Sequence, residues 1–172
     1  MTITINGSGT ITGVSAGGLP SGTVTQATLA TNVAGTAPAF SAYPNATLSI
    51  ANSTATKILF QTEEFDTNSN FASSTFTPTV AGYYQLSTLV GVTGTTIATE
   101  ATIAIYKNGS VYKYLADPYA SAISMLGGSC LVYANGTTDY FEVYMFQYSG
   151  SSRTISSNSQ VTWLQGVMVR SA

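Results

Sequence analysis

The sequence predicts an all-β protein. Short runs of alternating apolar and polar residues are separated by turn signals along most of the chain, and no stretch repeats apolar residues at helical spacing over three turns. Asn108-Gly109 stands between two such runs and is typical of a two-residue hairpin turn, because both central positions of a type I′ turn require positive φ. The predicted class is therefore a sandwich of antiparallel strands.

Strands are predicted throughout the part of the chain that follows Pro38. They are Ala39–Tyr43, Lys57–Phe65, Tyr83–Val92, Ala101–Tyr106, Val111–Leu115, Ser129–Tyr133, Tyr140–Tyr148 and Val161–Val169. Asn135-Gly136 repeats the hairpin signal just before Tyr140–Tyr148. A jelly roll β-sandwich of about 8–10 antiparallel strands places this number in two sheets without helices.

Charge is scarce over the whole chain and excludes several functions. Only 7% of the 172 residues are charged, the net charge is −2, and Lys and Arg do not cluster, so nucleic acid is not an expected partner. Histidine is absent and Cys130 is the only cysteine, which excludes Ser-His-Asp and Cys-His catalysis, histidine-ligated zinc and an intrachain disulfide. We expect Cys130 to be an inert core thiol.

Membrane insertion and secretion are not predicted either. No apolar run reaches the roughly 18–20 residues that cross a bilayer, and the first basic residue is Lys57, so the charged start of a secretory leader is missing. We expect a soluble, unprocessed product.

The first third of the chain differs in composition from the rest. Residues 1–56 contain no charged residue, and seven of the 16 glycines lie in them. Two explanations are open, a flexible linker or an arm that becomes ordered against symmetry mates or a larger assembly. Spaced branched aliphatic residues favour the arm, namely Ile3, Ile5, Ile11, Val14, Leu19, Val24 and Leu29. The expected parts are an extended attachment arm over residues 1–37 and a jelly-roll knob over residues 38–172.

Both faces of the Tyr140–Tyr148 strand are largely apolar. One face carries Phe141, Val143 and Met145, and the other carries Tyr140, Tyr144, Phe146 and Tyr148. Since one face of a sandwich strand is normally solvated, the aromatic face requires cover from another chain, from the arm or from a loop of the same subunit. We expect a homo-oligomer that partly buries these four aromatic residues.

The chemistry-bearing side chains do not form a convincing site. Glu63, Glu64 and Asp66 are the only acidic cluster, and neighbouring strand residues point to opposite faces, so Glu63 and Glu64 cannot face each other as a glycosidase pair. No Asp-rich calcium loop is visible, and no catalytic residue, metal or cofactor is predicted. The eleven tyrosines give amphipathic surface for sugar stacking or for protein contacts. The ligand-binding candidates are Tyr112, Tyr114 and Tyr119, for which edge or core packing is the alternative.

A ladder of aromatic and glycine residues runs from Phe60 to Thr88. Its members and spacings are Phe60, five residues, Asp66, four residues, Phe71, then Phe76, five residues, Gly82, one residue and Tyr84. Further matching pieces are Phe40-Ser41-Ala42, Tyr106-Lys107-Asn108-Gly109, Gly136 to Asp139 and Leu164-Gln165-Gly166-Val167-Met168. This pattern resembles the complement-type globular head, the trimeric jelly roll shared by complement-like and tumour-necrosis-factor-like proteins. Phe76, Tyr84 and Leu86 are expected in the core, and Gly82 is expected to permit a tight turn.

The N-terminal segment adds a second resemblance. Ile5-Asn6-Gly7-Ser8-Gly9-Thr10-Ile11-Thr12-Gly13, followed by Gly17-Gly18-Leu19-Pro20, is similar to the attachment regions of bacteriophage virion proteins. The two resemblances imply a non-enzymatic homotrimeric knob on the virion surface, docked through its arm on other virion proteins. Its role would be a tail-fibre tip for attachment to a host glycan or protein, or a capsid decoration or head fibre. The alternative is a free carbohydrate-binding, lectin-like module.

Overall fold

The structure, a computed structural model, describes residues 4–5, 11–12, 37–97, 99–120 and 122–172. Contacts divide the chain into two units, Met1–Gly35 and Thr36–Ala172. In the first unit, β1 (Thr4–Ile5) pairs antiparallel with β2 (Ile11–Thr12), and Ile5 lies opposite Ile11.

The remaining arm candidates of the sequence analysis lie outside the described residues. They are Ile3, Val14, Leu19, Val24 and Leu29. The docking role of the arm therefore stays a prediction.

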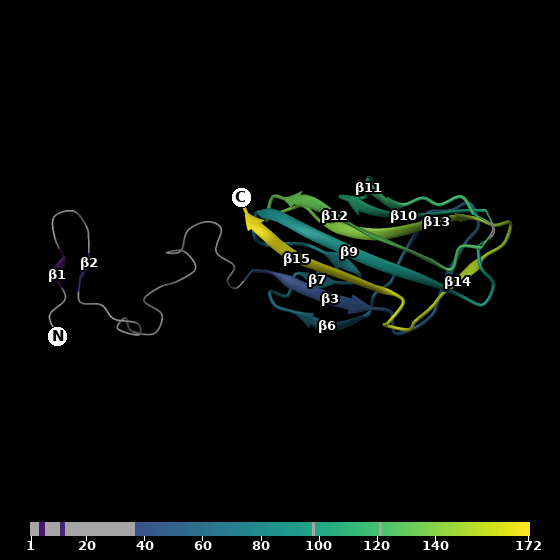
Figure 1. The fold of residues 1–172 in the computed structure, drawn as a ribbon, viewed down its shortest axis with the longest axis horizontal. Coiled ribbons are helices and arrows are strands. Elements are labelled where there is room, and N and C mark those ends of the chain that lie inside the picture. Colours follow the sequence, from purple (N-terminus) through teal and green to yellow (C-terminus); the bar gives the residue numbers. More distant parts are fainter. Residues whose placement is uncertain (1–3, 6–10, 13–36, 98, 121) are drawn as a thin grey trace. The chain divides into compact units, whose positions relative to one another are not determined.

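The described part of the second unit, the body, is built from β-strands without a helix (Figure 1). Eight strands have five or more residues: β3 (Ala39–Tyr43), β6 (Thr62–Asp66), β9 (Gly82–Thr93), β10 (Glu100–Lys107), β11 (Ser110–Ala116), β12 (Met125–Ala134), β13 (Phe141–Tyr148) and β15 (Trp163–Ser171). The shorter ones are β4 (Leu48–Ile50), β5 (Thr56–Lys57), β7 (Phe71–Ala72), β8 (Thr75–Phe76) and β14 (Arg153–Ile155). The predicted all-β class is confirmed.

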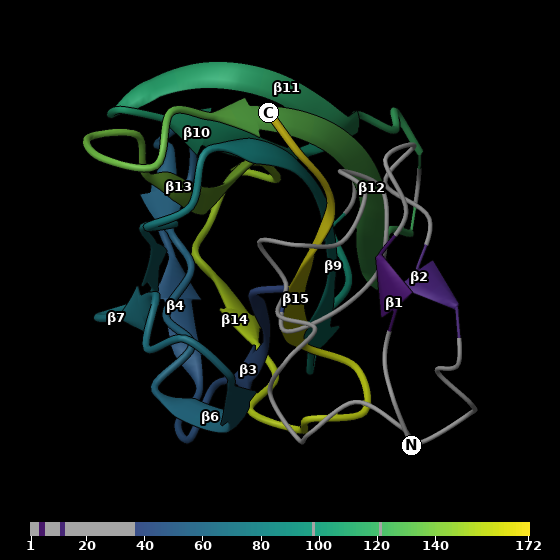
Figure 2. The ribbon, with the colours of Figure 1, turned by 90° about the vertical axis from the view of Figure 1, so that its left-hand side faces the viewer.

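The strands form two antiparallel sheets that face each other (Figures 1 and 2). The six-stranded sheet has the order β11-β10-β13-β8-β7, with β5 also paired to β13. The seven-stranded sheet has the order β4-β14-β9-β15-β3-β6, with β12 also paired to β9. Inward side chains of both sheets form one core, as expected for a jelly-roll sandwich.

Aromatic side chains from the Phe60–Thr88 ladder pack against other aromatic rings in the core. Phe76 is central: its ring centroid is 4.5 Å from that of Phe40, 5.4 Å from that of Tyr84 and 6.4 Å from that of Phe141. Tyr84 donates a hydrogen bond of 2.7 Å to the carbonyl of Val80, and burial raises the pKa of Tyr84 to about 12. The expectation that Phe76, Tyr84 and Leu86 belong to the core is confirmed.

The predicted hairpin at Asn108-Gly109 is confirmed, whereas the one at Asn135-Gly136 is wrong. Asn108 and Gly109 have φ of 54° and 78° and connect β10 to its neighbour β11. Gly136 also has positive φ, but the strands on either side of it belong to different sheets: β12 pairs with β9 and β13 with β10. The local signal is that of a turn, and only long-range pairing decides whether a turn closes a hairpin.

The predicted strand Lys57–Phe65 is two strands in different sheets. Its start belongs to β5, which pairs with β13, and its end to β6, which pairs with β3. Between them, the backbone amide of Phe60 donates to the hydroxyl of Ser74, and Ser74 donates back to the carbonyl of Phe60. The alternating pattern continues across the crossover because Ile58 and Phe60 both enter the core.

Gly82 serves close packing instead of a tight turn. It is the first residue of β9 and does not have positive φ. A Cβ at this position would lie 2.5 Å from the carbonyl oxygen of Arg170 and 3.2 Å from the Cα of Ser171. Glycine therefore lets the end of β15 approach β9.

Candidate functional site

The outer face of the seven-stranded sheet carries exposed apolar side chains and few charged ones. Cross-strand register aligns Leu131 of β12 with Gln85 of β9 and Gln85 with Val167 of β15. The neighbouring row places Tyr133 opposite Tyr83, with ring centroids 5.5 Å apart. Because successive side chains of a strand alternate between faces, these residues point away from the core that holds Tyr84 and Leu86.

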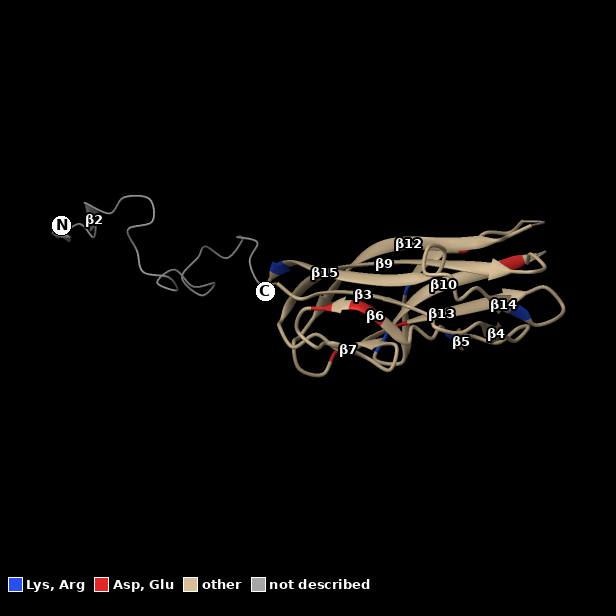
Figure 3. Ribbon diagram, turned by 90° about the horizontal axis from the view of Figure 1, so that it is seen from below, with Lys and Arg blue, Asp and Glu red and all other residues tan. Residues whose placement is uncertain are grey.

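We call this surface the β9–β12–β15 face. Its large exposed members are Tyr83, Met125, Leu131, Tyr133, Val167 and Val169, and Phe65 of β6 borders it. β9 and β12 contain no charged residue, as Figure 3 shows, and β15 contains only Arg170 near its end. A groove of about 410 Å³ crosses it between Phe65, Gln85 and Val167.

The outer face of the six-stranded sheet carries the aromatic residues expected between subunits. Phe141, Val143 and Met145 of β13 are buried, so the alternate residues Tyr144, Phe146 and Tyr148 point outward. Tyr144 and Phe146 are half-buried within their own subunit, and Tyr140, just before β13, is half-buried as well. Their position in a subunit contact stays a prediction.

A shallow depression of about 310 Å³ lies on this outer face, and we call it the β10–β11–β13 pocket. Its aromatic lining consists of Tyr106, Tyr114, Tyr144 and Phe146, which come from three neighbouring strands. Tyr106 and Tyr144 stack with ring centroids 4.0 Å apart. The polar lining consists of Glu100, Thr102 and Asp117.

Charged groups around the pocket are held by specific partners. Thr102 donates a hydrogen bond of 2.6 Å from its hydroxyl to Asp117 Oδ1. Lys57 Nζ forms an ion pair of 2.7 Å with Glu142 Oε1, and Nζ also donates to the hydroxyl of Thr75. Burial of the Tyr144 side chain, and next the neighbouring charge of Glu142, raise the pKa of Tyr144. The Tyr144 phenol is therefore neutral at physiological pH.

The structure separates the three tyrosines that the sequence groups as ligand candidates. Tyr114 lines the pocket, whereas Tyr112 lies close to Lys107, whose Nζ is 5.8 Å from the Tyr112 ring centroid. Tyr119 is exposed beside Glu100, with which it forms an isolated β-bridge. Only Tyr114 joins the aromatic lining.

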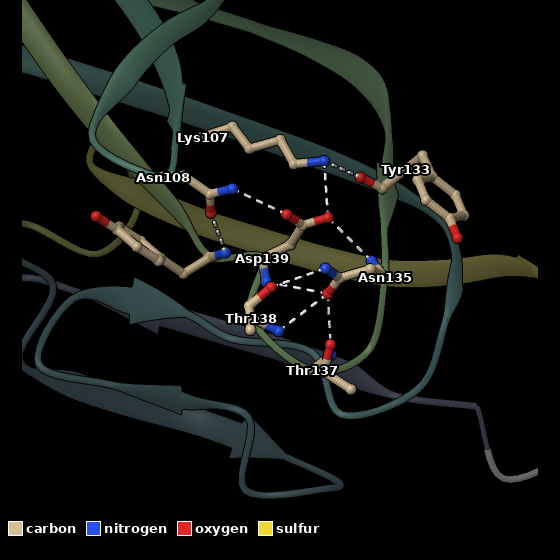
Figure 4. Close-up of polar contacts among 8 residues, drawn as sticks. Lys107, Asn108, Tyr133, Asn135, Thr137, Thr138 and Asp139 are labelled. Atoms are coloured by element: carbon tan, nitrogen blue, oxygen red, sulfur yellow. Dashed lines mark hydrogen bonds and ion pairs between the residues drawn. The ribbon is translucent and has the colours of Figure 1, made fainter.

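A polar network holds the loop between β12 and β13 (Figure 4). Asp139 accepts from Lys107 Nζ at 2.8 Å, from Asn108 Nδ2 at 2.9 Å and from the backbone amide of Asn135 at 3.0 Å. The side-chain oxygen of Asn135 in turn accepts three backbone amides of the same loop. Burial alone would raise the pKa of Asp139, but the hydrogen bonds and the charge of Lys107 outweigh it and hold that pKa below its usual range. The network joins the β10–β11 turn to this loop.

The residues of the acidic cluster, Glu63, Glu64 and Asp66, have different surroundings in the structure. Glu64 accepts a hydrogen bond of 2.6 Å from Ser41, and Asp66 accepts the backbone amide of Phe71 at 2.7 Å, which fixes the intervening turn. Glu63 is exposed on the other side of a β-bulge. Among the described residues, no group of three or more Asp, Glu or Cys side chains is placed to hold a metal ion.

Two further findings concern the thiol and the membrane. Cys130 is half-buried and packs against the core, and burial raises the pKa of its thiol despite the opposing charge of Lys113. Within the described ranges, no helix is long and apolar enough to span a bilayer.

Comparison with known proteins places the fold. No family model and no curated protein matches the chain. Among solved structures, the globular domain of zebrafish complement 1qA protein is 16% identical with a TM-score of 0.56 and covers 79% of this chain and 99% of that one. The body has the complement- and TNF-like jelly-roll fold.

Two more structures share this jelly-roll fold. Murine APRIL at pH 8.0 is 16% identical, with a TM-score of 0.56, over 77% of this chain and 98% of that chain. The PRD1 vertex protein P5, from a phage, is 16% identical with a TM-score of 0.58, over 80% of this chain and all of that chain. At these identities the likeness establishes the jelly-roll fold, which the sequence ladder predicts.

The β9–β12–β15 face and the polar part of the pocket were not predicted from the sequence. A signal for the face exists in β12, where Leu131 and Tyr133 alternate with the core residues Val132 and Ala134. The same two-sided apolar pattern occurs in β13. No local signal joins Thr102 to Asp117, because their contact depends on the pairing of β10 with β11.

Proposed function

We propose that the chain is a non-enzymatic structural protein of a bacteriophage virion. In this proposal the jelly-roll body is one subunit of a homotrimeric knob, and the N-terminal arm docks the knob on other virion proteins. The knob serves as a tail-fibre tip for host attachment or as a capsid-surface decoration. The observation that carries the proposal is the apolar, charge-poor β9–β12–β15 face on a fold that a phage vertex protein also has.

The β9–β12–β15 face is the proposed contact between subunits. Exposed apolar patches of this kind mark protein interfaces, whose centres are depleted in charge and enriched in aromatic side chains. Leu131 is 60% exposed and lies on β12 opposite Gln85, next to the row that contains Tyr133 and Tyr83. The outer face of the six-stranded sheet suits a subunit contact less, because burying the carboxylates of Glu100 and Asp117 without a cationic partner is costly.

Light scattering on the full chain tests the oligomeric state and the face together. We expect a trimer for the wild type and dissociation for Leu131→Glu, because an ionised carboxylate inside an apolar contact costs several kcal/mol. Tyr148→Glu is the matched control on the other outer face, since Tyr148 is also exposed, at 54%. Dissociation by Tyr148→Glu alone would instead support the contact expected from Tyr140, Tyr144, Phe146 and Tyr148, and a monomeric wild type would reject both.

The arm is tested by deletion. Removing residues 1–30 should leave a folded, trimeric knob that no longer incorporates into particles, because the knob contacts do not involve the arm in this proposal. Incorporation at normal copy number would show that the arm is only a spacer. An electron density map of the intact particle then distinguishes a tail-fibre tip from a capsid decoration.

A further inference from the structure

We propose that the β10–β11–β13 pocket binds a neutral glycan. The pocket lies on the opposite sheet from the proposed subunit contact, so it stays accessible in the trimer. Its lining combines aromatic rings with a few convergent hydrogen-bonding groups, which is the composition of small-molecule sites.

The aromatic part offers flat apolar surface for the C–H faces of sugar rings. Tyr114 is 66% exposed, and Tyr106 of β10 stacks on Tyr144 of the neighbouring β13. Mutual stacking restrains the rings of this pair, so little side-chain entropy remains to be lost when a ligand binds. Phe146 extends the aromatic surface along β13.

The polar part offers acceptors for sugar hydroxyls. The hydrogen bond from Thr102 restrains the Asp117 carboxylate, which has further lone pairs for a ligand because an ionised carboxylate accepts up to about four hydrogen bonds. Glu100 supplies a second carboxylate at the start of β10, near the same end of the pocket as Asp117. A hydroxyl-rich ligand can therefore satisfy these groups while its ring faces contact the tyrosines.

The charge of the lining decides the class of glycan. Glu100 and Asp117 are its charged residues, and the nearby Lys57 is neutralised by Glu142. Sialic and uronic acids would be repelled by the two carboxylates, and a second copy of this chain would bring the same carboxylates against them. A neutral sugar fits each of these constraints.

A glycan array probed with the full chain tests the proposal first. The array carries neutral oligosaccharides, sialylated and uronic-acid-containing oligosaccharides, and amine-terminated linkers without sugar. We expect binding to neutral members only. Binding confined to the anionic members or to the bare amines, or to no member at all, would overturn the proposal.

Titration calorimetry with the best neutral array member then tests the location. Tyr114→Ala should weaken binding about tenfold, since one aromatic contact contributes up to roughly 1.5 kcal/mol. Asp117→Ala should weaken binding by a similar factor. Tyr112→Ala is the matched control, because it removes an exposed tyrosine from the same strand outside the pocket, and it should bind like the wild type.

Further measurements distinguish a failure of the glycan pocket from a failure of the proposed trimer. Tyr114 and Asp117 are both exposed, so their substitution should leave the thermal unfolding midpoint unchanged. A monomeric protein that still binds a neutral glycan through Tyr114 would reject the trimer and support the pocket. Equal loss in Tyr112→Ala and Tyr114→Ala, or no loss in either, would reject the pocket.

Discussion

The outer faces of the two sheets differ although both belong to one sandwich. On the β9–β12–β15 face, apolar side chains such as Leu131 and Val167 stand among small polar ones without a charged neighbour in β9 or β12. On the six-stranded sheet, aromatic residues such as Tyr144 pack within their own subunit beside the Lys57–Glu142 ion pair. An exposed apolar surface with few charges suits a protein contact, whereas an aromatic surface with fixed acceptors suits a hydroxyl-rich ligand.

The difference shows that a large aromatic side chain on the outer face of a sheet need not be the more exposed one. In the sequence, Tyr144 and Phe146 favour a subunit contact because they are large and lie on the second face of an apolar strand. Their neighbours in the same subunit already cover them in part. Leu131 was not predicted as a contact residue, but its side chain is more exposed than those of Tyr144 and Phe146.

The largest expected effect concerns the core packing beneath the β9–β12–β15 face. Gly166 lies in the middle of β15, where a Cβ would collide with the Phe40 ring and would lie 2.8 Å from Leu86 Cδ2. Gly166→Ala should lower the free energy of unfolding by about 3 kcal/mol, because an overpacked core forces the strand outward. Urea denaturation measures this effect, with the exposed Ser110→Ala as the control that should change it by less than about 0.5 kcal/mol. A Gly166→Ala variant as stable as the wild type would contradict the close approach of β15 to the core.

The next effect concerns the network that joins the two sheets at the β12–β13 loop. The pKa of Asp139 is lowered in the folded state, so its contribution to stability is present above its unfolded pKa of about 4 and is lost as the pH falls through the folded value. Asp139→Asn should cost about 2 kcal/mol at pH 7, and the difference from the wild type should shrink in acid. Urea denaturation of both proteins at neutral and acidic pH checks this, and a difference independent of pH would contradict the ionic role of Asp139.

A smaller expected effect, the dependence of the unfolding midpoint on protein concentration, distinguishes the two outer faces. If the β9–β12–β15 face joins subunits, the unfolding midpoint of the wild type should rise with protein concentration, since association stabilises the folded state. Val167→Lys should weaken this dependence, whereas Tyr119→Lys on the other side should preserve it. Calorimetry over a range of protein concentrations measures both, and equal behaviour of the two variants would remove the contrast between the faces.

The smallest expected effect is a change in labelling rate along β12. Cys130 should react slowly with iodoacetamide, because its thiol is half-buried and burial raises its pKa. In a Cys130→Ala background, the exposed Ser129→Cys should react faster in the dissociated Leu131→Glu protein than in the trimer. Mass spectrometry over time measures the rates. Equal Ser129→Cys rates in the two proteins would place the subunit contact elsewhere.

The sequence by itself determined the all-β class, the Asn108-Gly109 hairpin and most of the long strands. These follow from local rules: alternation with a period of two, and the positive φ that Asn and Gly tolerate. The aromatic ladder also indicated the fold, and its members Phe76 and Tyr84 are buried in the core. The trimer contact and the arm stay predictions.

Only the tertiary structure decided which turns close hairpins and which side chains meet. Asn135-Gly136 has the local chemistry of a hairpin, but β12 and β13 join different sheets. The same reason separates Tyr112 from Tyr114 and brings Tyr106 onto Tyr144, since strand register sets both neighbours. Pairing between distant segments depends on the sum of many packing contacts, and no single stretch of sequence contains that sum.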